Sequence, residues 1–364
     1  MKGSGFLLIL LFCLTGILHP LSAYTQTSER SPSFFSINYR SGENKPHREV
    51  IKNLTYPYRG VDLKLGWQSL GNKQWQQAFR YPSYGIGLNW NTFKTAILGE
   101  PLALYFFTSF PQISTRYSRL DLEVNFGISY GINPYDEVSN PNNFSTGSST
   151  NAYFGLYLEQ AVDLGQHTDL FVSGGFTHYS NGALGYPNLG LNIPSLKAGI
   201  RYQPVYKEKI YPLNQAEFKP QWELLTFVGG GTRKWKTESV KDYRQLVISP
   251  AIYYRPAYKR RVGIGYELAF NESIRIVKGK EDYKGQQLLT HAVFAAHEFI
   301  IERFTIATQF GIYLYNMPSD KFYYERVGIA FHLTPWAKMV LNVKAHYFKA
   351  EYVETGLVFD LNIK

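Results

Sequence analysis

The stretch 120–128 reads Leu-Asp-Leu-Glu-Val-Asn-Phe-Gly-Ile, and its strict alternation of apolar and polar residues decides the expected fold. Successive side chains of a β-strand point to opposite faces, so this stretch predicts a strand with one apolar and one polar face. Residues 357–363 alternate in a similar way, with Leu357, Phe359 and Leu361 on one face. Segments that are apolar toward lipid and polar toward a lumen are typical of transmembrane β-barrels.

Strand-like stretches separated by turn signals continue along the whole chain. We predict an all-β fold, an antiparallel transmembrane outer-membrane β-barrel of about 12 to 16 strands. We further predict that residues 24–364 form a single barrel domain, with a long loop at 133–150. The candidate strands are 33–40, 60–69, 82–90, 101–109, 119–130, 150–163, 169–180, 194–203, 221–231, 244–254, 261–272, 286–302, 303–315, 321–333, 336–348 and 352–363.

The composition favours a barrel over other membrane folds. After the N-terminus there is no run of about 18 apolar residues, as a spanning helix would need. The chain contains 29 Tyr, 25 Phe, 6 Trp and 31 Gly. Aromatic residues near strand ends are typical of the girdles at the two membrane interfaces. A soluble secreted β-sandwich or β-helix remains the alternative.

Residues 1–23 have the features of a cleaved signal peptide. Lys2 supplies a positive start, an apolar run follows, and Leu21-Ser22-Ala23 is a small-residue cleavage site. Cys13, the single cysteine of the chain, lies in this segment, so the mature protein would use neither disulfides nor thiolates. We expect export to the bacterial cell outer membrane. The net charge of +10 suits the phosphates of lipopolysaccharide, and export argues against nucleic acid as a partner.

The strand expected at 169–180 places two reactive side chains on its more apolar face. His178 and Ser180 are two residues apart, so they share the face of Leu170 and Val172. A serine esterase needs a base beside the hydroxyl, a group that orients the base, and donors for the oxyanion. Asn181 and Gly182 follow at once, and their amide groups could supply those donors. A strand that ends in a polar turn is the simpler interpretation of the same residues.

The longer segment 178–192, HYSNGALGYPNLGLN, resembles the signature of outer-membrane lipid A 3-O-deacylases, the PagL-type family that includes acyloxyacyl hydrolases. The family pattern is His-x-Ser-Asn followed by Pro-Asn-x-Gly, here Pro187, Asn188 and Gly190. The resemblance implies that Ser180 is the nucleophile, His178 its base and Asn181 a neighbour of the oxyanion, all on the outer wall of a barrel. The implied partner is a membrane lipid, lipid A or lipopolysaccharide.

The chain departs from the family pattern in two ways. Smaller members are eight-stranded barrels of about half this length, so this chain would be a larger barrel. The family's third catalytic residue is a Glu, and Asn192 stands in its place. An Asn can hold an imidazole tautomer but cannot stabilise an imidazolium by charge. A different orienting carboxylate, Glu159 or Glu223, therefore remains open.

These features predict an outer-membrane carboxylic ester hydrolase that removes an ester-linked acyl chain from lipid A. The expected catalytic residues are His178, Ser180 and Asn192, with Asn181 and Gly182 at the oxyanion. Serine chemistry implies no cofactor and no metal. Two alternatives differ in class. A non-enzymatic channel or structural barrel would carry an inactive motif, and a phospholipase would need an acidic cluster for calcium, which is not found near the motif.

Overall fold

The computed structural model describes residues 32–46, 49–182, 185–204, 217–234, 242–277, 279, 282–315, 321–347 and 349–361. The signal peptide predicted at 1–23 lies outside the described residues. Short helices occur only in the connections of this part of the chain: η1 (Glu49–Ile51), α2 (Gln74–Ala78), α3 (Ile274–Val277) and η2 (Gly285–Leu288). None of these helices is long and apolar enough to cross a membrane.

The described residues contain sixteen β-strands, and each corresponds to one of the stretches predicted from the sequence. Most of the predicted ends differ from the observed ones by a few residues, because alternation marks the body of a strand and not its last residue. The strands are β1 (Ser33–Glu43), β2 (Pro57–Gln68), β3 (Ser83–Thr92), β4 (Gly99–Ser114), β5 (Ser118–Ile132), β6 (Thr150–Asp163), β7 (Thr168–Ser180), β8 (Leu191–Tyr202), β9 (Gln221–Lys234), β10 (Asp242–Ala257), β11 (Arg260–Asn271), β12 (Leu289–Ile301), β13 (Phe304–Tyr315), β14 (Tyr323–Thr334), β15 (Ala337–His346) and β16 (Lys349–Asp360).

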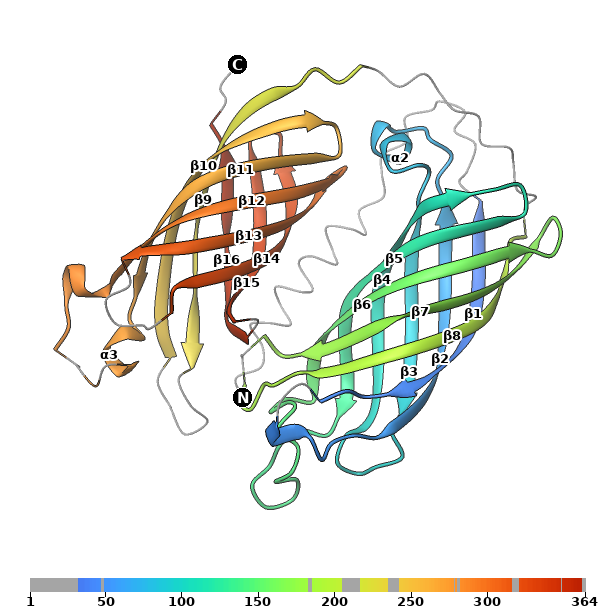
Figure 1. Cartoon of the computed structure of the whole chain (residues 1–364), viewed down its shortest axis with the longest axis horizontal. Coiled ribbons are helices and arrows are strands. Elements are labelled where there is room, and N and C mark those ends of the chain that lie inside the picture. Colours follow the sequence, from blue (N-terminus) through green and yellow to red (C-terminus); the bar gives the residue numbers. More distant parts are fainter. Residues whose placement is uncertain are drawn as a thin grey trace. The chain divides into compact units, whose positions relative to one another are not determined.

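The strands close into two barrels of eight, β1–β8 and β9–β16 (Figure 1). In the first barrel β1 pairs antiparallel with both β2 and β8, and in the second β9 pairs with both β10 and β16. The prediction of an all-β, antiparallel barrel fold is confirmed. The sixteen strands lie within the predicted range of 12 to 16, but they form two closed barrels and not the single barrel that was predicted. Closure depends on which distant strands pair, and the local alternation carries no record of that.

The walls of both barrels follow the expected alternation. On β5, Phe126 is exposed on the outside, whereas Asp121 and Glu123 are buried inside. On β12, Val293 points outward and Glu298 inward. An apolar outer wall around a polar interior is the arrangement that a lipid-embedded barrel requires, since the closed sheet leaves no backbone edge unpaired.

Ion pairs occupy the interior of the first barrel. Lys197 Nζ donates to Asp62 at 3.3 Å, and Lys64 pairs with Glu123. Arg201 forms a further buried pair with Glu159. An eight-stranded barrel is just wide enough for side chains to fill it, so these charges meet across the lumen and compensate each other.

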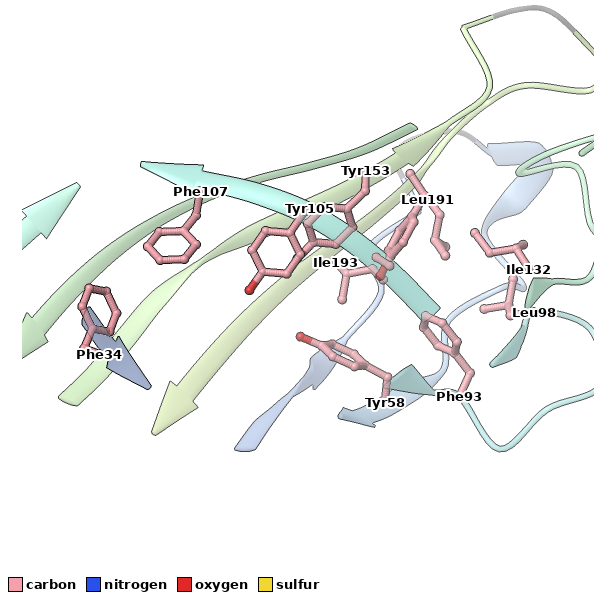
Figure 2. Packing of buried hydrophobic residues seen from close by; sticks show 12 residues of the cluster. Phe34, Tyr58, Phe93, Leu98, Tyr105, Phe107, Ile132, Tyr153, Leu191 and Ile193 are labelled. Atoms are coloured by element: carbon pink, nitrogen blue, oxygen red, sulfur yellow. The ribbon is translucent and has the colours of Figure 1, made fainter. Parts of the chain in front are cut away.

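Aromatic rings also pack together in the interior of this barrel, as Figure 2 shows. Tyr105 and Tyr153 stack with their ring centroids 5.1 Å apart, and Tyr58 lies 5.8 Å from Phe93 (Figure 2). The Tyr105 hydroxyl donates to Asp62 at 2.6 Å, so the ring packs while its polar end is satisfied.

The second barrel uses the same principle with its own residues. Arg326 bonds Glu267 at 2.6 Å and Glu354 at 2.7 Å. Lys344 reaches the other oxygen of Glu267 at 2.5 Å. Buried ion pairs therefore recur in both interiors, and a barrel of eight strands is narrow enough for such side chains to meet.

Candidate active site

Strands β7 and β8 bring the predicted residues together on the outer wall of the first barrel. Along β7, Leu170, Val172 and Phe176 are exposed, whereas Phe171 and Tyr179 are buried in the interior. His178 and Ser180 continue the exposed series, and both are half-buried. The two side chains therefore share the outer face, as the alternation predicts.

Asn192 lies directly across from His178 in the β7–β8 register. The imidazole Nδ1–H of His178 donates to Asn192 Oδ1 at 2.7 Å. This bond places the proton on Nδ1 and leaves Nε2 as the nitrogen with the lone pair, which is the tautomer that a general base needs. The structure thus joins two residues that are 14 positions apart in the chain.

Two donors point at the hydroxyl of Ser180. The backbone N–H of Gly182 donates to Ser180 Oγ at 3.2 Å, and the Asn188 side-chain amide Nδ2 lies 3.5 Å from the same oxygen. Gly182 has φ +63°, a left-handed conformation that glycine adopts without strain. The turn after β7 therefore directs amide hydrogens toward the position of the serine.

Asn181 is held by other partners. Its backbone N–H donates to Asn188 Oδ1 at 3.1 Å, and its side-chain amide donates to Gly185 O at 3.0 Å and Thr146 Oγ1 at 3.4 Å. The sequence pattern suggested Asn181 and Gly182 as donors; the N–H of Gly182 reaches Ser180 Oγ, and the second group near that oxygen is the amide of Asn188. The signal for Asn188 was present in the Pro-Asn-x-Gly element, but spacing alone could not show where its amide points.

Gly190 packs closely against the imidazole of His178. A Cβ atom at this position would lie 2.6 Å from His178 Cε1, and Gly190 has φ +76°. Both the close approach and the left-handed backbone require glycine here. The glycine of the Pro-Asn-x-Gly element therefore makes room for the ring that Asn192 orients.

The two carboxylates considered as substitutes for Asn192 lie elsewhere. Glu159 points into the first barrel and pairs with Arg201, on the opposite side of the wall from His178. Glu223 belongs to β9 of the second barrel and pairs with Arg261 and Arg255. Glu159 is directed into the barrel and His178 lies on the outer face of the same wall, so this carboxylate is not placed to orient the imidazole. Glu223 is directed into the interior of the second barrel and is engaged there by its arginine partners. The structure therefore supports neither suggestion.

Fold and site together define a class, the outer-membrane type of β-barrel with a serine, a histidine and amide groups gathered on its outer wall. Residues 60–201 match the family model of lipid A 3-O-deacylase (PagL), and residues 221–363 match that of the acyloxyacyl hydrolase C-terminal domain. The chain belongs to the lipid A 3-O-deacylase (PagL) family. The first match ends with β8 and the second begins with β9, so the two matches divide the chain as the barrels do.

Two solved structures are similar to the chain at low identity. Neisserial surface protein A is 10% identical with a TM-score of 0.34, over 48% of this chain and 99% of that protein. The Acinetobacter baumannii outer membrane protein Omp33 is 7% identical with a TM-score of 0.18, over 92% of this chain and 100% of that protein. No curated protein sequence matches the chain.

Proposed function

We propose that the protein is an outer-membrane serine esterase that removes an ester-linked acyl chain from lipid A. The observation that carries this proposal is the 2.7 Å bond between His178 and Asn192, two residues from Ser180 on the same outer face. Membership of the lipid A 3-O-deacylase family supports a lipid A substrate in the outer membrane and names the ester at position 3.

In the first half of the proposed reaction, Ser180 Oγ attacks the acyl carbonyl while Nε2 of His178 accepts the hydroxyl proton. Asn192 Oδ1 accepts the hydrogen bond of Nδ1–H and so keeps the ring in the reactive tautomer. The carbonyl oxygen becomes an oxyanion beside Ser180. The N–H of Gly182 and the amide of Asn188 already point at Ser180 Oγ, so they are the donors best placed to stabilise that charge.

Collapse of the tetrahedral intermediate breaks the bond between the carbonyl carbon and the sugar oxygen. The proton held on His178 passes to that oxygen, so the sugar hydroxyl leaves and an acyl-Ser180 ester remains. Water then attacks the acyl-enzyme with His178 again as the base. The products are a free fatty acid and the deacylated glycolipid, and Ser180 regains its proton.

The outer wall suits such a substrate. Exposed Leu170, Val172 and Phe176 continue from His178 along β7, and Leu196 is exposed on β8. These side chains would meet the acyl chains of lipids in the surrounding leaflet, so the ester bond could reach Ser180 without leaving the membrane. The proposal therefore needs no deep pocket.

The channel alternative finds less support in the interior. In the described part of each barrel, charged side chains meet across the lumen, for example Lys64 with Glu123 and Arg326 with Glu267. A channel needs a continuous water-filled lumen, whereas paired charges and aromatic rings fill this one. The filled interior thus favours an esterase site on the outer wall over a channel through the barrel.

The purified protein with lipid A tests the proposal through the fatty acid that it releases. We expect Ser180→Ala and His178→Gln each to lower kcat by a factor of about 10³ or more, since each removes a reacting group. Ser173→Ala, a buried hydroxyl on the inner face of the same strand, is the matched control and should stay near the activity of the intact protein. Release by Ser180→Ala at the intact rate would refute the mechanism.

A further inference from the structure

The loop between β5 and β6 contacts the β7–β8 loop, which directly follows the candidate nucleophile Ser180. Residues 143–147, here called the clamp segment, lie against residues 185–190 of the β7–β8 loop. Gly190 N–H donates to Ser145 O at 2.8 Å, and Gly147 N–H donates to Pro187 O at 2.5 Å. Two backbone hydrogen bonds therefore flank Thr146 and hold it against residues 185–190, here called the site loop.

Gly147 allows this close approach. A Cβ atom on Gly147 would lie 2.1 Å from Tyr186 O, a distance that no side chain could accept without moving one of the two loops. The absence of a side chain thus permits the clamp segment to pair with the site loop.

Thr146 connects the clamp segment to the site through its side chain. Its hydroxyl accepts a hydrogen bond from Asn181 Nδ2 at 3.4 Å and donates to Asn151 Oδ1 at 2.8 Å. Thr146 is only 2% exposed, so both bonds lie in a region shielded from water. The same hydroxyl oxygen also lies 3.2 Å from both the backbone N and the backbone O of Ser148. A buried hydroxyl constrains its partners more than an exposed one would.

The contact continues from Asn181 to the nucleophile. The Asn181 backbone N–H donates to Asn188 Oδ1 at 3.1 Å, and Asn188 Nδ2 lies 3.5 Å from Ser180 Oγ. Thr146 therefore acts on residues that in turn set the orientation of the Asn188 amide. It touches neither Ser180 nor a reacting atom directly in these contacts.

The clamp segment is itself held at its base. Asn143 is fully buried, and its Nδ2 donates to Ile97 O at 3.1 Å while its Oδ1 accepts the Ser145 N–H at 3.1 Å. Earlier in the loop, hydrogen bonds from the Ser139 backbone and hydroxyl and from the Val138 backbone lower the pKa of Asp136. Barrel-tip loops are commonly mobile, whereas this one is anchored by its own side chains.

We propose that Thr146 is a positioning residue for the esterase site, and that the clamp segment sets the orientation of the Asn188 amide relative to Ser180. This inference rests on the proposed function, because positioning has meaning only if Ser180 reacts. Displacing a reacting group by about 1 Å can cost about a hundredfold in rate, so a modest shift of this loop would be visible in kcat.

The test compares Thr146→Val, which keeps the shape and removes the hydroxyl, with Thr146→Ser, which keeps the hydroxyl. We expect Thr146→Val to lower kcat for lipid A deacylation about tenfold with KM changed by less than about twofold, and Thr146→Ser to restore most of the loss. The matched control is Thr305→Val in the second barrel, a fully buried threonine whose hydroxyl lies 3.3 Å from His332 Nε2. It should leave kcat unchanged.

A second readout separates this proposal from the proposed function. The rate of labelling of Ser180 by a fluorophosphonate probe can be measured without lipid A. We expect the probe to label the Thr146→Val variant more slowly than the intact protein. An intact protein that labels but releases no fatty acid would count against lipid A as substrate, while the labelling rates would still judge Thr146.

Folding of each variant is checked by heat-modifiable migration in gels. If Thr146→Val does not fold, Gly147→Ala takes its place, since its Cβ would push the clamp segment away from Tyr186 O. Equal kcat and equal labelling in the folded variant and the intact protein would overturn the proposal. A Thr146→Ser variant as slow as Thr146→Val would overturn it as well, because the hydroxyl would then not be the cause.

Discussion

Asn192 holds the imidazole of His178 through one neutral hydrogen bond, where the family pattern has a carboxylate. We expect Asn192→Glu to raise kcat at least about tenfold, because a negative charge beside Nδ1–H stabilises the imidazolium that forms in the transition state. Asn192→Ala should lower kcat, since the ring loses its orienting partner. Initial rates of fatty-acid release measure both effects. A slower Asn192→Glu variant with a correctly folded barrel would contradict this account of the site.

A second prediction concerns the substitution of Gly190. We expect Gly190→Ala to lower activity about a hundredfold while the barrel remains folded, because the new Cβ would fall 2.6 Å from His178 Cε1 and displace the ring. The matched control is Gly174→Ala on the outer face of β7, where the Cβ would meet only Leu196 Cδ2 at 3.6 Å. Steady-state kinetics of the two variants compare them directly. Equal activity in both would show that space beside His178 does not matter.

Sequence reasoning identified the site residues in part. His178, Ser180 and Asn192 lie on one face, as the period of two and the motif predicted, because strand alternation is a local property. The partners of Asn181 and the amide of Asn188 were not predictable, since they depend on how the turn after Ser180 folds back. Glu159 failed as a candidate because its inward direction follows from the register of the whole wall.

At the level of the strands, the interior charges should determine stability. Glu267 on β11 is 1% exposed and accepts hydrogen bonds from Lys344, at 2.5 Å, and Tyr324, at 3.1 Å, while Arg326 pairs with it at 2.6 Å. We expect Glu267→Gln to lower the free energy of unfolding by about 3–5 kcal/mol, because it leaves two buried cations without their shared anion.

Denaturant titration of the protein refolded in lipid vesicles, followed by tryptophan fluorescence, measures that loss. Glu49→Gln is the control, since its pair with Lys52 is exposed and should contribute less than about 1 kcal/mol. A change in the Glu267→Gln variant as small as that of the control would show that the interior network does not stabilise the second barrel.

The strands themselves were the most predictable part of the fold. Alternation of the kind seen in β5, together with the turn signals between strands, predicted all sixteen strands of the described chain. Both signals are encoded within about ten residues. Barrel closure was not predictable in this way. The pairing of β8 with β1 joins segments about 160 residues apart, and interior contacts such as that of Arg40 with Ser195 link these two strands although no local pattern connects them.

For the molecule as a whole, the two barrels differ in what their outer walls carry. Strands β7 and β8 of the first barrel hold His178, Ser180 and Asn192. The seventh and eighth strands of the second barrel, β15 and β16, have Val343, Ala345 and Val353 on their outward side. We therefore assign the proposed esterase activity to the first barrel alone.

The central claim is that Ser180 attacks an acyl ester of lipid A, and the lipid A of living cells tests it most directly. The intact protein and its Ser180→Ala variant are expressed in a host with fully acylated lipid A, and the lipid A is read by mass spectrometry. The account predicts loss of one hydroxyacyl mass with the intact protein and none with the variant. Unchanged lipid A in both strains, with both proteins folded in the outer membrane, would contradict it.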